Sequence, residues 1–253
     1  ATTDGTTVLI HGAVRAPRFV RGQTTNDQWL KSRTEPGPWA EIEGDRIIHT
    51  VPSEWVRTLD DPGRVAEFWD KVTDACADLA QIPVERRTKE RIVADVQISV
   101  GYMHAGYPIM THLDTKKHVL DVDYLMKEGS WGHFHEIGHN HQSDDWTFEG
   151  TVEVTVNLFT LYVYDKVLGK RPEDRSFAGD YLTKNSSKFA SENWSFDRWK
   201  EDPFMALTLY MQKQERFGWD QFKKVFAEYR KLDRSERPRD DQEKRDHWLV
   251  RFS

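Results

Sequence analysis

The sequence predicts an α+β fold with a β-rich first half and a helical second half. Two β-forming runs flank residues 44–45 with the spacing of a hairpin, and residues 91–100 have the strongest strand pattern in the chain. In the second half, apolar residues instead recur at helical intervals. At roughly 150 residues per domain, 253 residues form one large domain or two small ones, and we expect a β-rich lobe (1–122) followed by a helical lobe (123–253).

The β-rich lobe has a clear order of predicted elements. They are a short helix (26–33), two hairpin strands (39–44 and 46–51), a long helix (61–79) and two further strands (91–100 and 107–113). Asp61 and Pro62 supply an N-cap and a first-turn proline to the long helix. Pro108 lacks a backbone donor, so we expect the last strand to lie at an edge of the sheet. The rest of residues 8–37 is expected to wrap irregularly around the lobe.

The helical lobe is predicted from apolar periodicity. Its expected helices cover residues 130–142, 151–168, 203–216 and 219–232. Ser130 can cap the first of them, and Gly169 ends the second. Residues 230–246 contain seven basic and six acidic side chains, so we expect a solvated connector there.

Composition argues against several classes of function. The chain has 36 basic and 42 acidic side chains, and its formal net charge of −6 argues against a nucleic-acid partner. No apolar run reaches the roughly 18 residues of a membrane span. Cys76 is the one cysteine, so no internal disulfide can form. The chain begins at Ala1 rather than Met, as expected after removal of a leader or excision from a longer protein.

Residues 135–139 carry the motif that points to chemistry, His-Glu-Ile-Gly-His. Residues four apart share one face of a helix, so His135 and His139 can direct imidazole nitrogens at one ion, at about 2.0–2.1 Å. Glu136 then lies beside the ion without binding it. That is the position of a general base that takes a proton from a zinc-activated water.

A catalytic zinc site needs a third protein ligand, because zinc keeps its fourth position open for water or substrate. Glu153 lies fourteen residues beyond His139, on the next predicted helix and after a loop long enough to reverse the chain. Asn157 lies one turn further along that helix and faces the same way, so its side chain can orient a ligand imidazole. We therefore expect one catalytic Zn²⁺ held by His135, His139 and Glu153.

Other residues near the motif offer alternative assignments. His133 and His141 each lie two residues from a ligand and therefore point to other faces of the helix. Glu149 is acidic and near, but it precedes Gly150 in the connecting loop, which makes it the weaker choice for third ligand. The histidines could instead be ordinary helix-surface residues, an interpretation that four residues in register disfavour.

The motif region resembles a known family of zinc metallopeptidases. The matching residues are His135, Glu136, Gly138, His139, Gln142, Trp146, Gly150, Glu153, Val154, Thr155 and Asn157. Their pattern is similar to that of the enhancin-like and mucin-directed enzymes of peptidase family M-60, within the gluzincins. The similarity extends upstream to residues 38–40 and 106–108 and downstream to residues 217–219 and Trp248, and so covers most of the chain.

The resemblance implies a zincin fold, in which a twisted mixed sheet and an active-site helix lie below a helical lobe. It also implies a secreted or cell-surface zinc endopeptidase that cleaves O-glycosylated, mucin-type proteins. On this basis, residues 1–253 form a single metallopeptidase catalytic domain. The family's helical lobe is expected to continue past Ser253, so either the domain is truncated there or the lobe closes differently.

Substrate contacts near the zinc are expected at Tyr107, His112, Trp131 and Trp146. The two tryptophans flank the metal helix and can stack on sugars, with packing beneath that helix as the alternative. In a zincin the edge strand pairs with extended substrate, which assigns that role to residues 107–113. Candidates for the donor to the oxyanion are Tyr107, His112, Tyr181 and Tyr164, although core packing is favoured for Tyr164.

Two rival functions stay open at this point. The first is a glycan-binding or adhesion module that keeps zinc only for structure, and the second is a zinc hydrolase of small amides or esters. Glu136 disfavours the first, because a structural site has no use for a base that does not bind the metal. Only the family resemblance weighs against the second.

Overall fold

The computed structural model describes residues 9–83, 88–171, 184–185 and 195–253. The strands that it describes all lie before residue 112, and most of the long helices lie after residue 130. This arrangement confirms the predicted α+β class.

One mixed sheet forms the centre of the β-rich lobe. Across the sheet its strands are β1 (Arg18–Val20), β2 (Trp39–Glu43), β3 (Ile47–Pro52), β4 (Glu90–Ala94), β6 (Ile109–Thr111) and β5 (Met103–His104). β2 and β3 form the predicted antiparallel hairpin, and β6 and β5 form a second antiparallel pair. The pairs β1–β2, β3–β4 and β4–β6 are parallel. Parallel pairs need long crossover connections, and helices occupy the one between β3 and β4.

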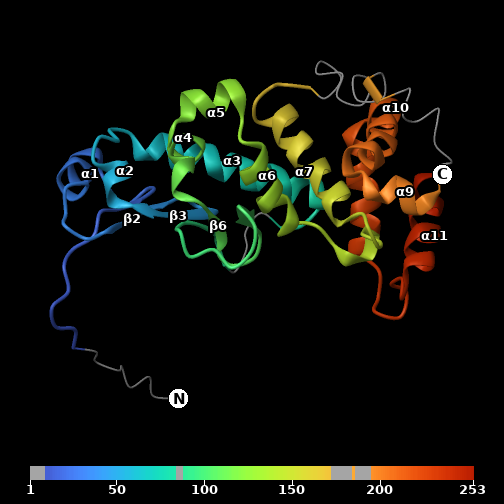
Figure 1. Ribbon diagram of the computed structural model, residues 1–253, viewed down its shortest axis with the longest axis horizontal. Helices are drawn as coiled ribbons and strands as arrows, with labels where there is room; N and C mark the ends of the chain where they lie inside the picture. Colours follow the sequence, from blue (N-terminus) through green and yellow to red (C-terminus); the bar gives the residue numbers. More distant parts are fainter. Residues whose placement is uncertain (1–8, 84–87, 172–183, 186–194) are drawn as a thin grey trace.

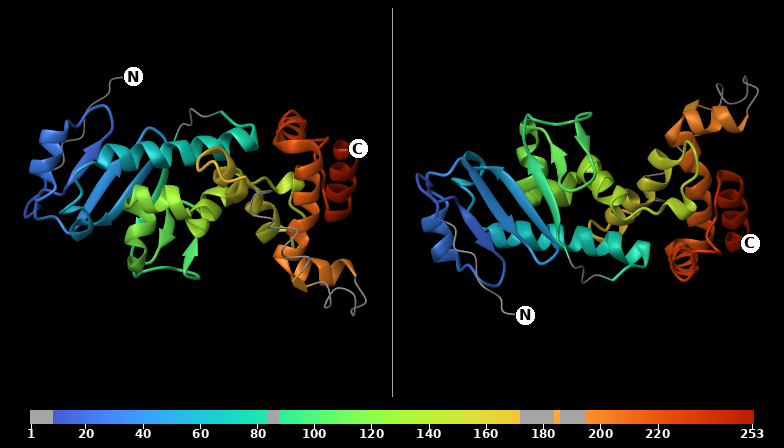
Figure 2. Two further views of the ribbon diagram at one scale, coloured as in Figure 1. Left: turned by 90° about the horizontal axis from the view of Figure 1, so that it is seen from above. Right: turned by 90° about the horizontal axis from the view of Figure 1, so that it is seen from below.

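The helices complete the two lobes. In chain order they are α1 (Asn26–Ser32), α2 (Ser53–Val56), α3 (Pro62–Ala80), α4 (Lys116–Leu120), α5 (Val122–Glu128), α6 (Trp131–His139), α7 (Val152–Lys166), α9 (Phe196–Glu201), α10 (Pro203–Arg230) and α11 (Asp241–Phe252). Figure 1 shows the sheet at one end of the molecule and α9, α10 and α11 at the other. The long α3 runs from the sheet towards the helical lobe (Figures 1 and 2), and α6 packs against both α3 and α7.

α3 also holds the turn of the β2–β3 hairpin. Asp70 on this helix accepts hydrogen bonds from the backbone nitrogens of Asp45 and Arg46, at 2.8 and 2.7 Å. A Cβ atom at Gly44 would lie only 2.4 Å from Asp70 Oδ1, so this close approach of turn and helix requires glycine. The hairpin is therefore fastened to the helix that covers the sheet.

The predicted strands differ from the structure in three respects. The strand predicted for residues 91–100 ends at Ala94, because the Asp95 carboxylate accepts hydrogen bonds from the next two backbone N–H groups, at 2.6 and 3.2 Å, and turns the chain. The segment 107–113 is not an edge: its strand β6 lies between β4 and β5, and Pro108 precedes the paired residues. β5 is the edge strand on that side. β1 lies in a segment that was expected to be irregular.

The helical lobe contains the predicted helices in the predicted order, together with α5, α9 and α11, which were not predicted. α10 contains the two predicted helices, which meet at Gly218, where φ is 72°. Residues 230–246 were expected to form a solvated connector, but α11 begins at Asp241 within them. The charged first turns of α11 hid its helical character, since its buried residues, Trp248 and Phe252, lie near its end.

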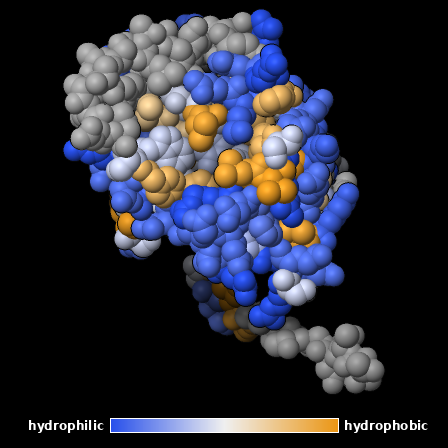
Figure 3. All heavy atoms as spheres, turned by 90° about the vertical axis from the view of Figure 1, so that its right-hand side faces the viewer, coloured by the Kyte–Doolittle hydropathy of each residue, from blue (hydrophilic) through white to orange (hydrophobic). Residues whose placement is uncertain are grey.

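The end of the molecule formed by α9, α10 and α11 presents hydrophobic residues among hydrophilic ones (Figure 3). A pocket of about 250 Å³ opens there, lined mainly by apolar side chains that include Phe148, Phe196, Trp199 and Trp248. In the described part of the chain, each helix is too short or too polar to cross a bilayer.

His49 of β3 is a buried polar group in the core of the β-rich lobe. It is fully buried, and neither of its ring nitrogens has a hydrogen-bond partner among the described residues. Its ring lies against Trp69 of α3, with 5.2 Å between ring centroids. Burial lowers the pKa of His49 to about 3. The folded protein therefore keeps this ring neutral at pH values where the unfolded chain takes up a proton.

We expect stability to decrease as pH falls from 7.5 to 5.0, because only the unfolded state binds a proton at His49. For an unfolded pKa of about 6.5, this one group removes about 2 kcal/mol from the free energy of unfolding over that interval. Chemical denaturation at several pH values measures the effect. His49→Leu is expected to lose about 2 kcal/mol less than the wild type, whereas His11→Gln, at an exposed position, should follow the wild type. Equal pH slopes for His49→Leu and the wild type would contradict this prediction.

Candidate metal centre

The two motif histidines lie one turn apart on α6, close to the point where α6 crosses α7. The rings of His135 and His139 have centroids 4.6 Å apart, and their side chains are 15% and 16% exposed. Gly138 allows the close crossing, since a Cβ atom there would lie 3.0 Å from the Cβ of Phe159 on α7. The glycine of the motif therefore serves the packing that brings the two helices together.

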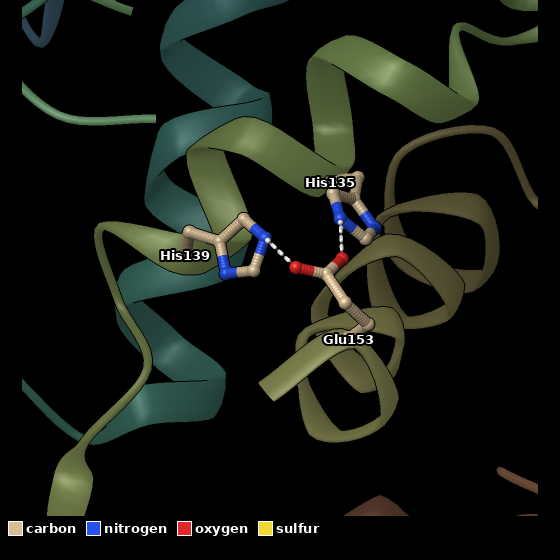
Figure 4. A group of neighbouring side chains, drawn as sticks. All are labelled: His135, His139 and Glu153. Atoms are coloured by element: carbon tan, nitrogen blue, oxygen red, sulfur yellow. Dashed lines mark hydrogen bonds and ion pairs between the residues drawn. The ribbon is translucent and has the colours of Figure 1, made fainter. Parts of the chain in front are cut away.

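Glu153 reaches the same point from the first turn of α7 (Figure 4). Its Oε2 lies 2.9 Å from His135 Nε2, and its Oε1 lies 3.6 Å from His139 Nε2. The three ligand atoms lie within 4.8 Å of one another, and no other group in the described ranges meets this criterion for holding a metal ion. Two imidazoles and one carboxylate form a donor set typical of catalytic zinc. The residues present therefore fit a zinc ion with one position left for water or substrate.

Two amide side chains hold the imidazoles in place. His135 Nδ1 donates to Asn157 Oδ1 at 2.9 Å, and Asn157 Nδ2 donates to the backbone oxygen of Glu153 at 2.8 Å. His139 Nδ1 donates to Gln142 Oε1 at 3.1 Å, and Gln142 Nε2 donates to the backbone oxygen at the start of α7 at 2.9 Å. Because both Nδ1 atoms carry protons in these contacts, each Nε2 atom can give up the proton that it directs at Glu153 and offer its lone pair to a metal.

The sequence predicted the position of Asn157 but assigned no role to Gln142. The spacing was an available signal. Gln142 lies three residues after His139, and side chains three residues apart on a helical turn are close enough to contact each other. Its second hydrogen bond depends on the start of α7 and is visible only in the fold.

The pKa values of Glu153 and Glu136 are shifted in opposite directions. Hydrogen bonds from His135 and His139 hold the pKa of Glu153 well below its usual range, although burial opposes them. Burial raises the pKa of Glu136; His135 and His139 oppose that rise, and Glu153 adds to it. Glu153 thus stays anionic, as a ligand must, while Glu136 is the carboxylate with the greater affinity for a proton.

The alternative ligands lie away from this point. His133 is buried and shares a hydrogen bond of 2.7 Å with Ser130 Oγ. His141 is also buried, and its Nδ1 lies 2.7 Å from the backbone oxygen of Ile137. Glu149 pairs with a lysine of α9 at 3.3 Å. None of the three belongs to the cluster of converging ligand atoms.

The two tryptophans that flank α6 pack into the protein. Trp146 is fully buried and stacks on Phe226 of α10, with 4.3 Å between ring centroids. The prediction that Trp146 contacts substrate is therefore wrong, because apolar packing under the helix takes its ring out of reach of solvent. Trp131 is partly buried, with its ring centroid 6.0 Å from that of Tyr164 and 6.2 Å from that of Phe204.

The remaining candidates for contact with substrate differ in exposure. Tyr107 is 61% exposed, and His112 is partly exposed. Tyr164 is buried and donates a hydrogen bond to a backbone oxygen of α5 at 3.2 Å, so its expected packing role is correct and it is not the donor to an oxyanion. Tyr181 lies outside the described residues.

A family model and several curated relatives match the sequence of this chain. The family model described as "Peptidase M60, enhancin and enhancin-like" matches residues 12–253. A TRPM8 channel-associated factor homolog of Xenopus laevis is 38% identical over 250 residues, and TRPM8 channel-associated factor 1 of Homo sapiens is 39% identical over 251 residues. Each match covers 97% of this chain and 27% of the relative. The chain thus spans about a quarter of the length of these relatives.

Solved structures share the fold at lower identity. A conserved protein of unknown function from Bacillus anthracis superposes with a TM-score of 0.78 at 24% identity, covering 94% of this chain and 50% of the other. The catalytic module of the metalloprotease ZmpA from Clostridium perfringens has a TM-score of 0.66 at 16% identity, with 96% and 49% covered. Both the α+β architecture and the resemblance inferred from the motif are confirmed. Because the family model matches almost the entire chain, this protein belongs to the peptidase M60, enhancin and enhancin-like family.

Proposed function

We propose that the chain is the catalytic domain of a zinc-dependent endopeptidase that acts on O-glycosylated, mucin-type proteins. One observation carries the proposal: His135, His139 and Glu153 converge on one point while Glu136, next to the first ligand, stays out of the ligand set. A structural zinc site is closed by four protein ligands and needs no such carboxylate.

The residues have distinct tasks in peptide hydrolysis. A bound Zn²⁺ would supply Lewis-acid polarisation of the scissile carbonyl and lower the pKa of water to about 7. Glu136 takes the proton of the attacking water and passes it to the leaving amine, and its raised pKa suits both transfers. Asn157 and Gln142 keep the two imidazoles oriented throughout.

An extended substrate has one strand edge available beside the centre. β5 is the last strand on its side of the sheet, and it packs against α6. A peptide can add to such an edge through backbone hydrogen bonds. We therefore propose that residues 103–104, and not residues 107–113, pair with the substrate. Tyr107, His112 and the exposed part of Trp131 are the described side chains that we propose for contact with a glycan.

The glycoprotein substrate is supported by family membership. One solved relative is the M60 catalytic domain of Clostridium perfringens ZmpC in complex with the sialyl T antigen, with a TM-score of 0.64 at 15% identity and 94% of this chain covered. At that identity the match shows the fold, and the carry-over of a glycan substrate is our proposal. Secretion or display at the cell surface belongs to the same proposal.

The curated relatives favour a second candidate function. They are named for association with a channel and are 37–43% identical to this chain, well above the identity to the solved peptidases. In that case the domain would be a binding module whose metal centre serves structure. The side chain of Glu153 is 58% exposed, so the cluster is open to solvent on that side, which favours the peptidase.

A single assay separates these functions. The purified protein is loaded with zinc, its metal content is measured, and it is incubated with a heavily O-glycosylated protein with and without a chelator. We expect chelator-sensitive fragments of the glycoprotein. Zinc binding without cleavage would favour the binding module. If the protein leaves the glycoprotein intact but hydrolyses small esters or amides offered in parallel, the small-substrate hydrolase is favoured.

Asn157→Ala is expected to keep the fold but weaken zinc affinity or kcat/KM by roughly 10–100-fold, because His135 loses the acceptor that orients it. Asn157→Asp keeps an acceptor oxygen and should retain more of both. Zinc titration and peptide kinetics measure the two effects. Unchanged values for Asn157→Ala would restrict Asn157 to helix packing.

A further inference from the structure

We infer that Asn140 is a positioning residue for substrate binding, because its side chain fastens the β5–β6 hairpin to the end of the metal helix. The inference rests on the proposed peptidase function. Asn140 follows His139 directly and forms the C-cap of α6. It belongs neither to the ligand set nor to the two amides that hold the imidazoles.

The contacts of Asn140 join three parts of the fold. Its Oδ1 accepts a hydrogen bond from the backbone nitrogen of Gly106 at 3.0 Å, and its Nδ2 donates to the backbone oxygen of Gly106 at 3.0 Å. Nδ2 also donates to Glu90 Oε2 at 2.7 Å. Glu90 is buried at the start of β4, so the amide connects the end of α6, the hairpin turn and the centre of the sheet.

The two bonds to Gly106 set orientation as well as distance. One side chain pairs with the N–H and the C=O of one residue, as a neighbouring strand would, so the peptide planes on both sides of Gly106 are held. Gly106 has a φ of +111°, which L side chains rarely adopt, although the space around its Cβ position is open. Glycine is therefore required here for the backbone conformation that turns both groups towards Asn140.

The hairpin held in this way carries the edge strand beside the metal centre. At the other end of α6, a Cβ atom at Gly132 would lie 2.8 Å from the sulfur of Met103, so β5 is in close contact with the helix. Met103 and Asn140 thus hold the β5–β6 hairpin against α6. Met103 does so by packing, whereas Asn140 does so by hydrogen bonds, which also fix orientation.

Loss of these bonds should affect substrate binding more than chemistry. The hydrogen bonds of Asn140 do not involve His135, His139 or Glu153, so zinc affinity is expected to stay within about twofold of the wild type. A peptide paired with β5 gains the same contacts in the ground state and the transition state. Loosening β5 therefore raises KM with little change in kcat. We expect an increase in KM of about tenfold for Asn140→Ala.

The test compares Asn140→Ala with Asn26→Ala, a matched substitution at the exposed start of α1, and with Gly106→Ala, which disturbs the same contact from the other side. Zinc titration, kcat and KM on an O-glycosylated peptide, and hydrogen exchange of residues 101–107 are measured for each. Asn140→Ala and Gly106→Ala should both raise KM and speed exchange in residues 101–107, with zinc affinity kept. Asn26→Ala should match the wild type.

Two results would overturn the inference. One is an unchanged KM with unchanged exchange in Asn140→Ala, and the other is loss of zinc in that variant, which would make Asn140 part of the metal centre. If the wild type cleaves no peptide, the proposed function fails separately. The role of Asn140 is then decided by peptide binding to zinc-loaded protein and by exchange: faster exchange with weaker binding supports it, and no change in either refutes it.

Discussion

Glu136→Gln is expected to lower peptide cleavage by about 10³-fold while the protein keeps its full zinc content. General acid–base catalysis contributes about 10²–10⁴-fold, and glutamine can neither take nor return a proton. Glu136 lies outside the converging ligand set, so its replacement leaves His135, His139 and Glu153 in place. The glutamine is nearly isosteric, which keeps the burial around the site.

Zinc stoichiometry and single-substrate kinetics on the same preparations measure the two halves of this prediction. Glu54→Gln, an exposed position on α2, is the matched control and should behave as the wild type. Zinc lost together with activity would show that Glu136 binds the metal. Activity kept at the wild-type level would remove its role as a base.

Glu153→Ala is expected to reduce zinc affinity by more than about 100-fold, because it removes one of the three proposed protein ligands. Loss of an outer hydrogen-bond partner costs at most about 100-fold. His135→Ala and His139→Ala should do the same. Glu149→Ala is the matched control on the same stretch of chain, and it should keep zinc because Glu149 instead pairs with a lysine of α9.

Competition of each variant with a chromogenic chelator gives the affinities. If Glu149→Ala lost zinc while Glu153→Ala kept it, the third ligand would be misassigned. If both variants kept the zinc affinity of the wild type, neither glutamate would be a ligand and the proposed set of His135, His139 and Glu153 would be wrong.

The convergence of His135, His139 and Glu153 was predictable because each part of it depends on local geometry. His135 and His139 share a face whenever their segment is helical, and Glu153 and Asn157 share one on the next helix. The hairpin around Gly44 and the helix after Pro62 were predictable for the same reason, since turn and capping signals lie within a few residues.

Features that depend on distant partners could not be predicted from local pattern. β5 has two paired residues and exists because β6 lies beside it, so the edge of the sheet was assigned to the wrong strand. A tryptophan can stack on a sugar or on another aromatic ring, and its sequence position does not distinguish the two. In the fold, Trp146 stacks on Phe226. Asn140 gave no signal, because Gly106 and Glu90 lie far from it in the sequence.

Cleavage of a matched pair of peptides tests the proposed function most directly. One peptide carries an O-linked N-acetylgalactosamine on a serine or threonine, and the other has the same sequence without the sugar. Zinc-loaded wild-type protein is incubated with each, beside Glu136→Gln and a chelator-treated sample, and the products are identified by mass spectrometry. We predict cleavage of the glycosylated peptide alone, next to the modified residue, by the untreated wild type alone. Equal cleavage of both peptides would contradict glycan dependence, and no cleavage of either by zinc-loaded protein would contradict the peptidase itself.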